Sequence, residues 1–97
     1  MENMFRNYLI NMGYKEYTLS GNPSTVYDYI RRIDFICREE GNISWYELMN
    51  KINIVLPKYD VYGEKEHLGA KSHNAVINAL RRFNEAIKAE VFITAVE

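Results

Sequence analysis

The sequence predicts an all-α fold, a single-domain bundle of four helices, or of five if the C-terminal tail adds one. Two long segments, 22–40 and 71–90, repeat apolar residues at steps of three and four, which is the helical period. The 97 residues suit one domain, and we see no linker that divides residues 1–97. Only two prolines and five glycines are present, so the turn signals that strands need are mostly missing. The composition, 47% apolar and 26% charged, is that of a globular protein and argues against disorder.

The first predicted helix spans residues 2–12. Phe5, Tyr8, Leu9 and Met12 recur at helical steps and share one face. Gly13 is a plausible C-terminal stop, because glycine adopts the left-handed conformation that ends many helices. Residues 14–21 are expected to form a connecting loop.

The second predicted helix, 22–40, has two alternative starts. Either Asn22 caps it with Pro23 at the first helical position, or Ser24 caps it one step later. Gly41 supplies the stop. One side of this helix carries, at helical spacing, Val26, Tyr29, Ile30, Ile33, Ile36, Cys37 and Glu40.

The third predicted helix, 44–56, has the clearest start signal. Ser44 and Glu47 fit a capping box, in which each side chain satisfies a free backbone amide of the other residue. Pro57 is expected to end this helix, because proline lacks the amide that an interior position needs. A polar loop is expected over residues 58–70.

The fourth predicted helix, 72–90, starts at Ser72. Its apolar face comprises Val76, Ala79, Leu80, Phe83, Ala86 and Ile87. The tail 91–96 is β-branched and apolar, and it either extends this helix or packs as an irregular end.

The charge and the cysteine content narrow the function classes. The formal net charge is −1, whereas dedicated nucleic-acid binders usually carry a strong basic excess, so any basic patch must come from local clustering. Cys37 is the only cysteine; it allows no intramolecular disulfide and is expected to be buried. No signal peptide and no run of roughly 20 apolar residues is present, so we expect a cytoplasmic protein without a membrane partner.

The sequence shows no pattern typical of an active site. His67 and His73 match no recognised metal-ligand spacing, and the glycines are scattered singly rather than in a phosphate-binding loop. We therefore expect a non-enzymatic binding module with no metal, no cofactor and no small-molecule substrate.

Phe35 lies on the polar side of the second predicted helix, opposite its apolar stripe. An aromatic ring in that position either covers a neighbouring segment or meets a partner. In the second case Phe35 is the anchor of a protein interface, and Arg32 and Arg38 belong to its rim.

The last predicted helix presents Asn74, Asn78, Arg81 and Glu85 in a row, with Lys71 just before it. Asparagine pairs with adenine and arginine with guanine or phosphate, so this row could enter a major groove of DNA. The alternative is a solvated face with an Arg81–Glu85 ion pair.

Three motifs together resemble the N-terminal core-binding, SAM-like domain of tyrosine recombinases and phage integrases. They are Phe5-x-x-Tyr8-Leu9, then Ser24-Thr25-Val26-Tyr27-Asp28-Tyr29-Ile30, and the segment from Lys71 through Leu80-Arg81-Arg82-Phe83. The resemblance covers roughly Phe5 to Ile87 and implies a four-helix domain that clamps duplex DNA with its second and fourth helices. The DNA-facing positions that it implies are Ser24, Thr25, Tyr27, Arg31, Lys71, His73, Asn74, Asn78 and Arg81.

The chain departs from that family in two respects: it lacks the recombinase catalytic domain, and its net charge is slightly acidic. Two functions follow as hypotheses. One is a small DNA-binding accessory of a phage or mobile element. The other is a protein-binding inhibitor of a host nucleic-acid enzyme, similar to anti-CRISPR proteins, with Phe35 as its anchor.

Overall fold

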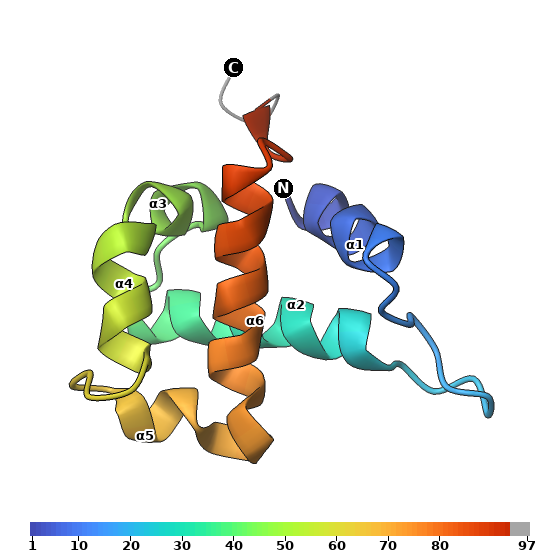
Figure 1. The fold of residues 1–97 in the computed structure, drawn as a ribbon, viewed down its shortest axis with the longest axis horizontal. Helices are drawn as coiled ribbons and strands as arrows, with labels where there is room; N and C mark the ends of the chain where they lie inside the picture. The colour runs from blue at the N-terminus through green and yellow to red at the C-terminus, as the bar shows by residue number, and fades with distance from the viewer. Residues whose placement is uncertain (94–97) are drawn as a thin grey trace.

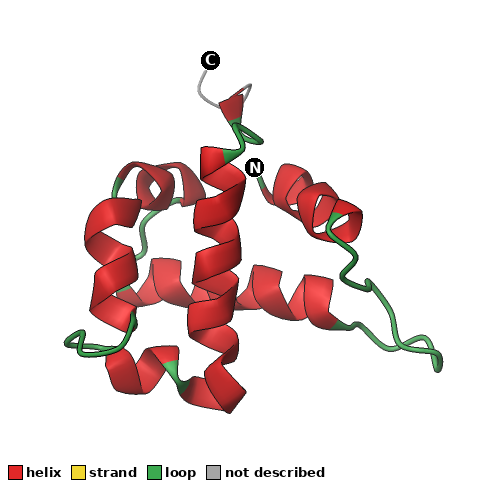
Figure 2. Cartoon of the chain, viewed as in Figure 1, coloured by secondary structure: helices red, strands yellow, loops and turns green. Residues whose placement is uncertain are grey.

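The computed structural model describes residues 1–93 and confirms the all-α prediction, since these residues form helices and no strand (Figure 2). Six helices are present in this range instead of the four or five predicted. They are α1 (Glu2–Asn11), α2 (Thr25–Glu39), α3 (Trp45–Asn50), α4 (Ile52–Tyr59), α5 (Glu66–Gly69) and α6 (Lys71–Lys88).

The helices α2 and α6 form the centre of the bundle. Figure 1 shows α6 crossing α2, with α1 to one side of the crossing and α3 and α4 to the other. Most of the predicted apolar residues of both helices are buried, which removes their side chains from water and supplies most of the driving force for folding. Tyr29, Glu40 and Ile87 of the predicted faces are only partly buried, and Ile77 is buried in addition. The buried residues are Val26, Ile30, Ile33, Ile36 and Cys37 of α2, and Val76, Ile77, Ala79, Leu80, Phe83 and Ala86 of α6.

An aromatic cluster joins Phe5 of α1 and Phe92, which follows α6, to this core. The ring of Phe5 meets the ring of Phe83 edge to face at 5.5 Å, and Trp45 packs on both. Phe92 adds its ring to Phe83 at 5.2 Å and is only 2% exposed. Residues 91–93 therefore follow the second alternative for the tail, an irregular packed end, while residues 94–96 lie outside the described range.

The predicted helix stops are confirmed at Gly13 and Gly41. Both have φ of +97°, the left-handed conformation that glycine adopts without a steric penalty. At the start of α2, Ser24 occupies the position before the helix, as in the second alternative, but its hydroxyl makes no capping hydrogen bond. The capping box of Ser44 and Glu47 is present as predicted.

The prediction that one helix ends at Pro57 was wrong. The chain breaks at Lys51, and α4 then continues through Pro57 to Tyr59. The lost amide hydrogen bond of a proline is offset here, because the added turn buries Tyr59, which is 1% exposed, and brings its hydroxyl to Glu40.

The predicted loop 58–70 and the predicted start at Ser72 also needed correction. The loop contains α5, whose buried Gly69 lies against the backbone of Tyr59. Ser72, His73 and Asn74 all have left-handed φ of +54° to +68°, so regular helical geometry begins after them and Ser72 is not the cap. Such a conformation is strained in residues that carry a β-carbon.

Candidate functional site

The structure distributes the predicted DNA-facing residues over three regions. The first is the N-terminal end of α2, the second is the outer side of α2 together with the start of α6, and the third is the side of α6 that faces α4 and α5. The residues predicted for the alternative protein interface lie in the second region.

A groove of 690 Å³ separates the N-terminal half of α2 from α1. Pro23, Tyr27 and Arg31 line it from one side and Arg6 from the other. The Tyr27 hydroxyl donates to Glu16 at 3.1 Å and lies 3.5 Å from the Arg6 guanidinium. Tyr27 is thus held in place by internal partners. Ser24 and Thr25, just before it, are half-buried.

The outer side of α2 gathers cations around one aromatic ring. Arg31, Arg32 and Arg38 line a hollow of 300 Å³ together with Phe35 and Asp34. Their spacing of three and four residues places these side chains on neighbouring parts of the helix surface. Lys71, at the start of α6, adds its ammonium 5.5 Å from the centre of the Phe35 ring. We call Arg31, Arg32, Phe35, Arg38 and Lys71 the α2 patch.

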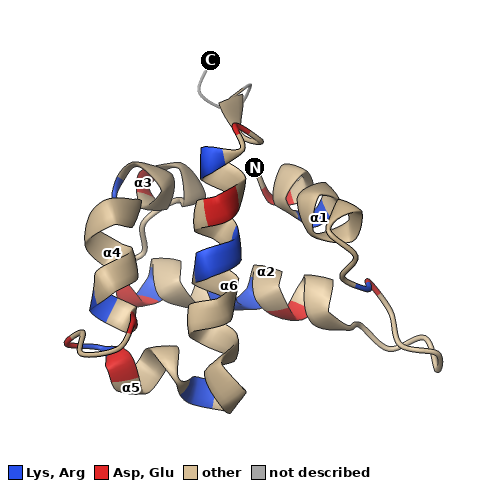
Figure 3. Ribbon diagram, viewed as in Figure 1, with Lys and Arg blue, Asp and Glu red and all other residues tan. Residues whose placement is uncertain are grey.

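The cations of this patch differ in how far they are already paired. Arg31 lies 3.0 Å from Asp28, yet its side chain is 75% exposed. Arg32 lies 3.5 Å from the same carboxylate and is less accessible. Arg38 is exposed and has no ion-pair partner among residues 1–93. Asp34, the second acid here, accepts a 2.8 Å hydrogen bond from the Trp45 indole. Figure 3 shows the basic segments on α2 and at the start of α6.

Phe35 lies between the core and the cationic hollow. It is half-buried and packs against the core, and the Lys71 side chain covers it, so it does cover a neighbouring segment. It also forms part of the wall of the cationic hollow. Arg31, predicted as a DNA contact, and Arg32 and Arg38, predicted as a protein-binding rim, thereby share one surface.

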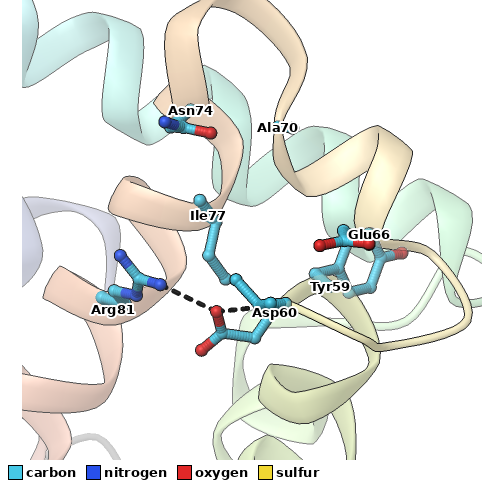
Figure 4. A pocket seen from close by; sticks show the side chains of 8 residues that line it. Tyr59, Asp60, Glu66, Ala70, Asn74, Ile77 and Arg81 are labelled. Carbon is cyan, nitrogen blue, oxygen red and sulfur yellow. Dashed lines mark hydrogen bonds and ion pairs between the residues drawn. The ribbon is translucent and has the colours of Figure 1, made fainter.

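The predicted row on α6 faces a different part of the molecule. Arg81 donates a 2.7 Å hydrogen bond to Asp60, which follows α4 (Figure 4). The same carboxylate oxygen accepts a hydrogen bond from the Val61 amide at 2.8 Å. This bond, assisted by Arg81 and opposed by burial, lowers the pKa of Asp60 below its usual value. Arg81 and Asn74 line a small pocket of 130 Å³ beside Tyr59 and Asp60.

The remaining α6 residues do not complete a continuous contact surface with Arg81. Asn78 is half-buried, and His73 is exposed within the strained segment before the regular helix. The alternative Arg81–Glu85 ion pair does not form, because Glu85 pairs with Arg82 instead. Two members of the α6 row, Arg81 and Glu85, are therefore engaged in internal ion pairs.

The sequence analysis placed Glu40 on one side of its helix but missed its partners; the Glu40 side chain is 9% exposed. Glu40, placed by its spacing on the apolar stripe of α2, accepts hydrogen bonds from Tyr59, Lys58 and Lys65. A carboxylate at a core position was itself the signal, since a buried charge requires partners. Its partners all come from residues 58–70, which were predicted as a loop.

Within residues 1–93, no group of three histidine, cysteine or acidic side chains is placed to hold a metal ion. In the same range no helix has the length and apolar character needed to cross a membrane.

Comparison with known proteins gives no further guide to function. No protein-family model, no curated protein and no solved structure matches this chain.

Proposed function

We propose that this chain is a non-enzymatic module that binds duplex DNA through its phosphate backbone, with the α2 patch as the contact surface. The observation that carries the proposal is the gathering of Arg31, Arg32, Arg38 and Lys71 around Phe35 on a chain whose net charge is −1. A local excess of cations on such a chain marks one surface as suited to an anionic partner.

Arginine suits phosphate because its planar guanidinium donates two parallel hydrogen bonds and stays charged. Arg31 and Arg38 lie two turns apart on one helix and are both exposed, so they can reach successive phosphates of one strand. The resemblance to integrase core-binding domains points to the same partner. Arg31 and Arg81 are both paired with a carboxylate, but the Arg31 side chain is 75% exposed, whereas that of Arg81 is 42% exposed and held by Asp60 from another part of the fold. Our proposal therefore assigns the contact to α2 and to Lys71 rather than to a clamp formed equally by α6.

Titration of a fluorescent duplex of about two helical turns at stepped salt concentrations tests this proposal. The affinity should fall steeply between about 50 and 200 mM salt, and Arg31→Ala and Arg38→Ala should each reduce the slope of log K against log salt by about 0.9. Lys51→Ala and Lys88→Ala are matched controls, because both lysines are exposed and lie outside the patch. The proposal fails if the duplex does not bind at low salt, or if the lysine variants weaken binding as much as the arginine variants do.

The second candidate is a protein-binding inhibitor of a host nucleic-acid enzyme. The observation that favours it is Phe35 itself, since an aromatic side chain ringed by arginines is a common arrangement at the centre of protein interfaces. An interface anchored in this way should weaken little with salt but strongly with Phe35→Ala. The salt titration therefore separates the two candidates.

A further inference from the structure

The segment between α1 and α2 folds into an ordered hairpin. Tyr17 and Pro23 pair across it, the Thr18 amide donates to the Asn22 carbonyl at 2.8 Å, and the Gly21 amide donates to the Thr18 carbonyl at 3.0 Å. At its base, the Ser24 amide donates to the Glu16 carbonyl at 2.7 Å, and the Tyr17 ring packs on the Tyr27 ring. The hairpin is thus fixed to the start of α2.

Side chains reinforce the tip of this hairpin. The hydroxyls of Thr18 and Ser20 lie 3.0 Å apart, and Asn22 donates to both, through its backbone amide and its side chain. Such a network holds the tip in one conformation before any partner arrives, which removes part of the entropy that binding would otherwise lose.

Leu19 stands at the tip and is fully exposed. A leucine on a preformed loop has no role in the core of this protein, because its side chain reaches none of the buried cluster. Residues 17–23 contain no charged side chain, so no carboxylate of the tip repels phosphate and no charge has to be dehydrated when the tip is buried.

We propose that Leu19 is a wedge that inserts between neighbouring base pairs of a DNA duplex held by the α2 patch. The inference rests on the proposed function. Leucine is one of the side chains that DNA-bending proteins insert from the minor groove, where they unstack one base step and kink the duplex. The hydroxyls and the amide beside Leu19 suit the uncharged base edges of that groove.

The position of the hairpin relative to the cations supports this assignment. Figure 1 shows the hairpin projecting beyond the N-terminal end of α2. Arg31 lines both the cationic hollow and the groove that leads past Tyr27 to Pro23 at the base of the hairpin. The groove thus connects the patch to the base of the hairpin, and its charged lining is mixed, with Arg6 and Arg31 beside Glu2 and Asp34. The 15 residues of α2 span about 22 Å, less than one helical turn of duplex DNA, so one duplex can meet both ends.

Base unstacking tests the wedge separately from phosphate binding. The probe is a duplex of about two helical turns with flexible thymine–adenine steps, in which 2-aminopurine replaces the adenine of each step. The fluorescence anisotropy of the duplex reports binding, and the fluorescence intensity of its 2-aminopurine reports unstacking. The intact protein should raise the intensity as it binds; Leu19→Ser should lose that rise yet still bind, and Leu19→Met should keep it, because methionine is also an inserting side chain.

The matched control is Ile54→Ser, which removes an apolar side chain that is 70% exposed from α4. Melting temperatures equal to that of the parent establish that Leu19→Ser, Leu19→Met and Ile54→Ser are folded. Unchanged 2-aminopurine intensity on binding of the intact protein, or an intensity rise that Leu19→Ser retains, overturns the wedge while leaving phosphate binding in place. Absence of any anisotropy change at low salt overturns the proposed function itself, and the wedge with it.

Discussion

The Tyr59 hydroxyl donates a 2.8 Å hydrogen bond to the carboxylate of Glu40, and this contact ties the last turn of α4 to the C-terminal end of α2. The same carboxylate receives the ammonium groups of Lys58 at 2.7 Å and Lys65 at 3.0 Å. The Glu40 side chain is only 9% exposed, so its charge depends on these three donors.

Glu40→Gln should lower stability and flatten its dependence on pH in the acid range. Burial acts to raise the pKa of Glu40, but the hydrogen bonds from Lys58, Lys65 and Tyr59 outweigh it and lower the pKa to about 2. A carboxylate whose folded pKa is depressed stabilises the fold above its unfolded pKa near 4.5, and this contribution is lost as the pH falls toward 2. The contribution at neutral pH is on the order of 3 kcal/mol.

Urea unfolding from pH 7 down to pH 2 measures this effect. Glu39→Gln is the matched control, because Glu39 is the exposed neighbour of Glu40 in sequence. If both variants show the same pH dependence as the parent, the Glu40 network does not stabilise the fold.

Gly69→Ala should destabilise the junction of α4 and α5. A β-carbon added at Gly69 would meet the backbone carbonyl of Tyr59, which cannot move without shifting α4. Overpacking of this kind typically costs about 1 to 3 kcal/mol. Thermal unfolding checks the result, with Ala70→Ser as a control that adds an atom at the exposed next residue. Equal melting temperatures would show that the two backbones are not in contact.

Cys37 should resist thiol reagents while the protein is folded. Burial, and to a lesser extent Asp34, raises the pKa of the Cys37 thiol to about 11, so only about one thiol in 10⁴ is ionised at pH 7. Labelling with a disulfide reagent should therefore be slow in native buffer and fast in guanidinium. Leu19→Cys in a Cys37→Ala background gives the comparison, because Leu19 is exposed. Rapid native labelling of Cys37 would contradict its buried position.

The sequence predicts those parts of the fold that depend on neighbours along the chain. The apolar faces of α2 and α6 follow from helical spacing, and the stops at Gly13 and Gly41 follow from glycine conformation. The helix α4 could not be predicted past Pro57, because the contact that favours its last turn is made with distant Glu40. The four residues of α5 are too few for a periodic pattern.

The candidate site also has one part that the sequence predicts and another that depends on contacts between distant residues. The gathering of Arg31, Phe35 and Arg38 follows from steps of three and four residues on one helix. The pairing of Arg81 with Asp60 could not be foreseen, since it depends on how α4 packs beside α6. The hairpin tip likewise has no periodicity, so the exposure of Leu19 becomes visible only in the folded chain.

Arg81→Ala and Arg38→Ala should affect different properties: the first should lower stability, and the second should weaken duplex binding. Arg81→Ala leaves the Asp60 carboxylate with the Val61 amide alone, so it should lower stability, by about 1 kcal/mol given that both side chains are partly exposed. Arg38→Ala removes a cation without an ion-pair partner among the described residues, so it should leave stability unchanged and weaken duplex binding. Urea unfolding and the salt titration, performed on both variants, measure the two quantities.

A loss of binding in Arg81→Ala as large as in Arg38→Ala, with no loss of stability, would instead place α6 against the DNA, as the family resemblance implies. The internal ion pair of Arg81 favours the first outcome, because a guanidinium that already has a carboxylate partner gains less from a phosphate than an unpaired one does.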